Sequence, residues 1–69
     1  MVRGRVKWFS QTKGFGFLEL TNGQDVYVHY TAIASQRSMI LQEGQVVDFD
    51  VLDTGKGLEA SNVMIVDYR

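Results

Sequence analysis

The apolar side chains of this sequence alternate with polar ones in several short runs. A period of two is typical of β-strands with one buried face. No stretch of ten residues carries the apolar spacing of an amphipathic helix. We therefore expect five short strands, at residues 2–9, 15–20, 26–30, 47–51 and 58–66. Such a set favours a small antiparallel barrel, because closing the sheet removes the exposed edges of an open one.

The connections between these strands contain turn signals. Asn22-Gly23 separates the second and third runs, and this pair favours a hairpin because both residues tolerate positive φ. Residues 31–34 suffice only for one helical turn, and residues 35–45 are expected to form a long loop. With 69 residues and no linker, the chain is expected to be a single domain over residues 1–69.

Alternation divides each expected strand into an inner and an outer face. In the third strand, Val26 and Val28 share one face, while Tyr27 and His29 share the other. A buried imidazole needs hydrogen-bond partners, so we expect His29 to face outward, and Tyr27 with it. The hairpin then places Phe15 and Phe17 on the same outer face. The expected core is the remaining apolar set: Val6, Leu18, Leu20, Val26, Val28, Val47, Phe49, Val51, Val63 and Ile65.

An outward row of aromatic side chains indicates a binding surface, since contiguous apolar patches are uncommon on protein surfaces. Aromatic rings stack on bases of any identity, and a duplex has already covered those base faces, so the row predicts binding of unpaired strands. Trp8 would extend the row, and Gly14 and Gly16 would leave the rings open to a flat ligand. In the alternative, Phe15 and Phe17 belong to the core, where most phenylalanines lie.

The net charge of −1 conceals a local excess of positive charge. Arg3, Arg5, Lys7 and Lys13 all precede the first acidic residue, Glu19, whereas the rest of the chain carries three basic residues against eight acidic ones. A basic region on a near-neutral domain is compatible with nucleic-acid binding. We expect the four early cations to contact phosphates. Ordinary surface charge is the alternative.

Several segments resemble the cold-shock domain family. Residues 13–18 (KGFGFL) are similar to the first ribonucleoprotein motif, and residues 26–30 (VYVHY) to the second. In RNA-recognition motif domains the second motif comes first and helices intervene, whereas here it follows after a hairpin. Residues 4–9, 43–45 and 60–63 also match the cold-shock pattern. The resemblance covers essentially the whole chain.

The resemblance to bacterial-type cold-shock proteins implies an all-β, five-stranded antiparallel OB-type barrel. It implies binding of single-stranded RNA and DNA, often with a preference for pyrimidines, and a nucleic-acid chaperone activity that affects transcription or translation. Asp25 would accept hydrogen bonds from base edges, or be only a solvated carboxylate at a strand entry. The binding residues implied by the resemblance are Lys7, Trp8, Lys13, Phe15, Phe17, Asp25, Tyr27, His29 and Tyr30.

This sequence departs from the family pattern at three positions. Ser38 stands where the family often has a loop aromatic residue, Leu58 where a proline is common, and Ser10 where an asparagine is common. The change at Ser38 removes one stacking ring from the expected site.

Other functional classes are less favoured. An enzyme would need paired titratable groups or a nucleophile with a base, and His29 has no recognisable partner. With no cysteine and one histidine, we expect no catalytic site, metal site or cofactor, and no small-molecule substrate. A protein-interaction barrel and another OB-fold nucleic-acid binder, such as a translation initiation factor, are the alternatives. No apolar run reaches the ~20 residues of a membrane helix, so we expect a cytoplasmic protein. We also expect a monomer, with a strand-exchanged dimer as the alternative.

Overall fold

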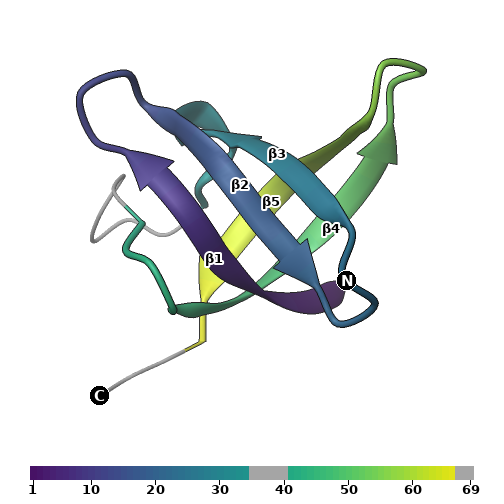
Figure 1. Ribbon diagram of the computed structural model, residues 1–69, viewed down its shortest axis with the longest axis horizontal. Helices are drawn as coiled ribbons and strands as arrows, with labels where there is room; N and C mark the ends of the chain where they lie inside the picture. Colours follow the sequence, from purple (N-terminus) through teal and green to yellow (C-terminus); the bar gives the residue numbers. More distant parts are fainter. Residues whose placement is uncertain (35–40, 67–69) are drawn as a thin grey trace.

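The computed structural model describes residues 1–34 and 41–66, which form a closed five-stranded barrel (Figure 1). The elements are β1 (Val2–Ser10), β2 (Phe15–Leu20), β3 (Asp25–His29), the 3-10 helix η1 (Tyr30–Ala32), β4 (Val46–Asp53) and β5 (Leu58–Ile65). All five expected strands are present, and the expected all-β barrel is confirmed. Tyr30 is an exception, because it begins η1 rather than ending β3. The backbone N–H of Ile33 donates to the carbonyl of Tyr30 and closes that helical turn at 3.1 Å.

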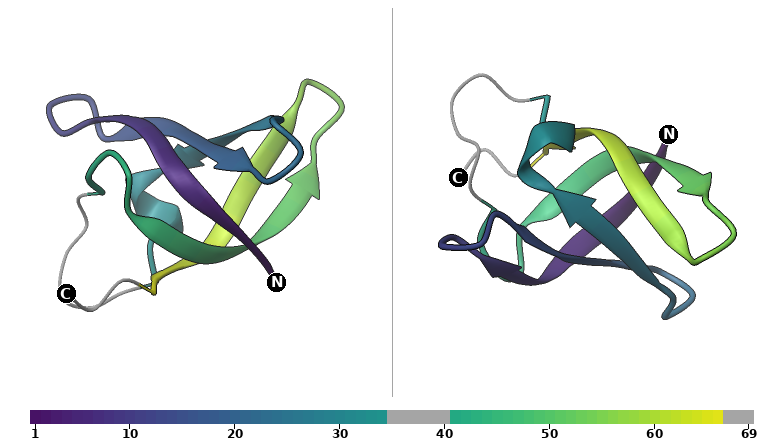
Figure 2. Two further views of the ribbon diagram at one scale, coloured as in Figure 1. Left: turned by 60° about the horizontal axis from the view of Figure 1, so that its bottom comes forward. Right: turned by 90° about the horizontal axis from the view of Figure 1, so that it is seen from above.

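The strands follow the order β1-β2-β3-β5-β4 around the barrel, and β4 pairs again with β1. Four of these pairings are antiparallel, as expected. The fifth, between β3 and β5, is parallel, with Tyr27 opposite Glu59. The right-hand view of Figure 2 shows these two strands side by side. Parallel neighbours cannot be joined by a hairpin, and here η1, the following connection and β4 separate them in the chain.

The interior is filled by the side chains that alternation places inward. Seven of the ten expected core residues are buried: Val6, Leu18, Val26, Val28, Val47, Phe49 and Val63. Leu20, Val51 and Ile65 are half-buried and pack against this core. Three apolar side chains outside the expected set are also buried, namely those of Ile33, Leu41 and Ala60. Ile33 and Leu41 lie outside the strands, where a period of two cannot assign a face.

The expected hairpin joins β2 to β3, but only one of its residues has positive φ. That residue is Gly23, at +91°. Its N–H donates to the carbonyl of Leu20, and the N–H of Leu20 donates to the carbonyl of Gln24, both at 2.9 Å. Asn22 contributes through its side chain, whose oxygen accepts from the N–H of Gln24 at 2.9 Å. The loop is therefore a three-residue connection closed by a left-handed glycine, not a two-residue turn.

An exposed ion pair joins β1 to β4 on the outside of the barrel. Arg3 donates from Nε and Nη2 to the two carboxylate oxygens of Asp48, at 2.8 and 3.2 Å. The hydrogen bond from Arg3 lowers the pKa of Asp48. A hydrogen bond from Asn62 lowers the pKa of Asp50 in the same way. Both carboxylates favour their charged form in the folded protein.

The Asp48 pair predicts a dependence of stability on pH. A carboxylate with a lowered native pKa stabilises the fold above its ordinary pKa of about 3.9, and that contribution is lost as the pH falls through the lower native value. We therefore expect Asp48→Asn to show a smaller loss of unfolding free energy between about pH 6 and pH 2. Urea unfolding followed by circular dichroism measures this loss. The same pH dependence in both proteins would show that this exposed pair contributes nothing to stability.

Candidate nucleic-acid interface

Four aromatic rings lie together on the outer face of β1, β2 and β3. In the pairing of β2 with β3, Phe17 lies opposite Tyr27, and Phe15 lies opposite His29. The ring centroids of Trp8 are 5.8 Å from Phe15 and 6.5 Å from Phe17. The ring centroid of Tyr27 is 6.1 Å from that of Phe15 and 6.0 Å from that of Phe17. These are contact distances for aromatic pairs, and we call Trp8, Phe15, Phe17 and Tyr27 the aromatic platform.

Exposure separates the platform from the core. Trp8 and Phe17 are 42% and 37% exposed. Phe15 and Tyr27 are half-buried, and each contacts two other rings of the platform. The next residue after Phe17 is Leu18, which is fully buried. The two phenylalanines therefore face outward, and the alternative that they belong to the core is wrong.

A β-bulge in β1 brings Trp8 onto the platform. Val6 pairs with Leu18 and Trp8 pairs with Phe17, so Lys7 is an additional residue in β1. Strict alternation from the buried Val6 would point Trp8 into the barrel. The bulge instead leaves both Lys7 and Trp8 exposed, and Phe9 packs partly against the core. Bulges commonly re-aim side chains in this way.

His29 and Tyr30 extend the aromatic surface beyond the end of β3. Their ring centroids are 4.5 Å apart. The Nδ1 atom of His29 lies 2.9 Å from the hydroxyl of Thr31, and the N–H of Thr31 donates to it at 3.4 Å. These contacts hold the imidazole beside Phe15, its partner across the sheet. The N–H of Tyr30 donates to the carbonyl of Gly14 at 2.8 Å, which ties η1 to the turn before β2.

The two glycines beside Phe15 allow close packing, and the expectation that Gly16 keeps the rings open is wrong, because this residue faces inward. Gly16 is buried on the inner face. A Cβ there would lie 2.6 Å from the Cα of Phe9 and would overlap the carbonyl oxygen of Trp8. A Cβ on Gly14 would lie 2.7 Å from the ring of Tyr30. The glycines thus let β1 and Tyr30 approach β2 and its turn.

Lys7 and Asp25 form an ion pair that crosses over β2. The Nζ atom lies 3.2 and 3.4 Å from the two carboxylate oxygens. Both side chains are about half exposed, at 52% and 47%. Exposed pairs of this kind contribute little free energy, so a phosphate could replace the carboxylate as the partner of Lys7. Lys13 is exposed in the β1–β2 turn, and its side chain makes no ion pair within residues 1–34 and 41–66.

Sequence reasoning missed a groove at the β5 edge of the platform. The groove has a volume of about 310 Å³ and runs between Phe17 and Tyr27 on one side and Lys56, Leu58 and Glu59 on the other. The pairing of β3 with β5 brings the β4–β5 turn to this place. Lys56 is exposed there and adds a positive charge next to the rings. The glycines at 55 and 57 are typical of a turn, but no local pattern indicates the strand that this turn meets.

The described residues place exposed cations beside the aromatic platform. Within residues 1–34 and 41–66, no three His, Asp or Glu side chains gather as a metal ion would require. In the same part of the chain, no helix is long and apolar enough to cross a membrane. Ser38, which stands where the family often has an aromatic residue, lies outside the described residues.

The barrel and its aromatic platform define a class of protein, the small OB-type nucleic-acid binders. The sequence model described as the 'Cold-shock' DNA-binding domain matches residues 2–66. The chain belongs to the cold-shock domain family and is a nucleic-acid-binding protein. The predicted family is therefore confirmed. This family is one of nucleic-acid-binding domains and not of enzymes.

Individual relatives agree with this assignment. The chain is 49% identical over 63 residues to the cold shock-like protein CspC of Bacillus cereus, covering 91% of this chain and 97% of that protein. It is 52% identical over 63 residues to the cold shock protein CspC of Bacillus subtilis, covering 91% and 96%. The solved structure of Drosophila Unr CSD456 matches with a TM-score of 0.79 at 20% identity. That match covers 99% of this chain and 27% of the Drosophila chain, and it shows the shared fold.

Proposed function

We propose that residues 1–69 act as a single domain that binds unpaired RNA and DNA by stacking bases on the aromatic platform, His29 and Tyr30. The observation that carries this proposal is the contact between four outward rings on three neighbouring strands. Stacking of one base on one ring contributes about 1–3 kcal/mol. Several rings side by side therefore supply useful affinity without any hydrogen-bond readout of sequence.

The charged residues of the site are proposed to hold the backbone and the base edges. Lys13 and Lys7 would contact phosphates, Lys7 after exchanging its carboxylate partner. Asp25, released from Lys7, would accept hydrogen bonds from the N–H groups of bases. Each cation that neutralises a phosphate of a single strand steepens the log–log dependence of affinity on salt by about 0.7.

Binding of this kind favours open strands over paired ones. A ligand that binds only one of two states shifts the equilibrium toward that state. We propose that the protein thereby melts weak RNA structure as a chaperone, with effects on transcription or translation in the cytoplasm. In this function the protein acts as a monomer and makes or breaks no covalent bond. A preference for pyrimidine runs is also proposed, since their backbones are flexible and their bases stack weakly on each other.

Trp8 provides the test, because it is the only tryptophan of the chain and lies on the platform. We expect its fluorescence to be quenched on adding an oligothymidylate, and much less on adding a duplex of the same length. Titrations with dT, dC, dA and dG oligomers at two salt concentrations measure base preference and salt dependence. An RNA oligomer incubated with the protein should remain uncleaved, since the proposed function breaks no covalent bond. Absence of quenching at low salt would contradict the proposal and favour a protein partner for the platform.

A further inference from the structure

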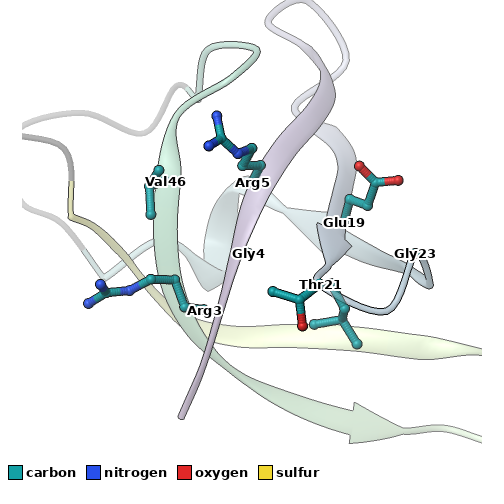
Figure 3. A pocket seen from close by; sticks show the side chains of 8 residues that line it. Arg3, Gly4, Arg5, Glu19, Thr21, Gly23 and Val46 are labelled. Atoms are coloured by element: carbon teal, nitrogen blue, oxygen red, sulfur yellow. The ribbon is translucent and has the colours of Figure 1, made fainter.

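A second groove lies on the outer face of the barrel, beyond the end of the aromatic platform. It has a volume of about 510 Å³, and Gly4 of β1 is one of the residues that line it. Figure 3 shows Arg3, Arg5 and Val46 on one side of this glycine, and Glu19 and Thr21 on the other. The volume lies within the range of about 300–1,000 Å³ that is common for small-molecule sites. None of the residues that line this groove belongs to the aromatic platform.

The register of β1 with β2 makes the groove continuous with the platform. Trp8 pairs with Phe17, the inward pair of Val6 and Leu18 follows, and Arg5 then pairs with Glu19. The side chain of Arg5 is therefore the next one along β1 on the outer face after Lys7. Residues two apart on a strand face are about 7 Å apart. A nucleic-acid strand that leaves the platform beside Trp8 would therefore reach Arg5 with one further nucleotide.

The two arginines of the groove differ in their partners. The guanidinium of Arg3 is held by Asp48 at 2.8 Å. Arg5 is exposed, and its side chain makes no ion pair or hydrogen bond within the described residues 1–34 and 41–66. In Figure 3 the guanidinium of Arg5 points toward the β4 side of β1, whereas the carboxylate of Glu19 lies on the β2 side. A planar guanidinium with five free donors is well suited to a phosphate.

We infer that the groove around Gly4 holds one further nucleotide of the strand that stacks on the platform, and that Arg5 donates to its phosphate. This inference rests on the proposed function, since the strand must first occupy the aromatic rings. It adds a subsite to the protein that contains no aromatic ring. Arg5 provides affinity there through charge, and the hollow accommodates the nucleoside.

Oligothymidylates of increasing length test the inference. Lengths from about four to ten nucleotides span the usual site size of one OB fold. We expect the affinity, measured by quenching of Trp8, to rise as the platform fills and then to rise again several-fold with one added nucleotide. Arg5→Gln should abolish this last increase and lower the salt slope of the longer oligomer by about 0.7. Arg5→Lys should restore the slope, because it retains the charge.

The matched variant is Glu19→Gln, which removes a negative charge from the opposite side of the same groove. It should enlarge the last increase rather than abolish it. The inference is overturned if Arg5→Gln weakens short and long oligomers equally, because the arginine would then act only through the general field of the protein. It is also overturned if the unchanged protein shows no last increase. Failure of every oligomer to quench Trp8 would instead overturn the proposed function itself.

Discussion

Replacing Phe17 by alanine is expected to weaken binding of a short oligothymidylate by about 1–3 kcal/mol, which is about 5- to 150-fold in Kd. Phe17 is 37% exposed and lies between Trp8 and Tyr27, so its removal takes a central ring from the platform. The unfolding free energy should change little, because the ring is not part of the buried core. Fluorescence titration and urea unfolding of the same variant measure the two quantities.

The control for Phe17→Ala is Met64→Ala. Met64 is an apolar residue of β5 with 49% exposure, and it pairs with Asp48, away from the platform. Met64→Ala should leave the affinity for the oligonucleotide unchanged. Comparison of the two variants then distinguishes loss of stacking from loss of exposed apolar surface in general. An unfolded Phe17→Ala protein, or a folded one with unchanged Kd, would contradict the assignment of this ring to the interface.

Replacing Leu18 by alanine is expected to lower the unfolding free energy by about 2–5 kcal/mol, the usual cost of this truncation in a core. Leu18 follows Phe17 in the chain but is fully buried among the barrel residues. At about 0.05–0.15 kcal/mol per residue, a chain of this length has a stability of only about 3–10 kcal/mol. The substitution therefore removes a large part of the total, and urea unfolding at low temperature measures it.

The milder variant Leu18→Met keeps the prediction testable if Leu18→Ala does not fold. A volume-conserving change of this kind usually costs less than about 1.5 kcal/mol, so it should fold and bind the oligonucleotide with the affinity of the unchanged protein. A fully stable Leu18→Ala protein would show that the inner and outer faces of β2 have been exchanged. Together with Phe17→Ala, this pair of neighbouring positions tests the two faces of one strand separately.

The faces of β2 and β3 were predictable because a strand allows only two. Once His29 was assigned outward, Tyr27 had to follow, and the hairpin register carried Phe15 and Phe17 with it. The same rule gave most of the core within the strands, but not Ala60, since the buried residues of β5 at 60 and 63 are three positions apart. Leu41 could not be assigned in this way, because it lies in the connection before β4, where position depends on the closed barrel.

The features of the site that could not be predicted from the sequence depend on contacts between segments far apart in the chain. Lys56 reaches the platform edge only because β5 lies beside β3, a parallel pairing that no local pattern indicates. The ion pair of Lys7 with Asp25 joins residues that are 18 positions apart. The sequence showed both side chains as candidates for binding but could not show that they are partners in the free protein.

The bulge in β1 matches the chemistry of the protein to that of a nucleotide. Every nucleotide joins an anionic phosphate to a flat ring through a sugar, so its two recognisable parts are always close neighbours. A regular strand presents consecutive side chains to opposite sides and could not meet both parts from adjacent positions. At Lys7 and Trp8 the bulge turns a cation and an indole to the same side. Because of one additional residue in β1, two successive side chains present a charge and an aromatic ring side by side, as a nucleotide does.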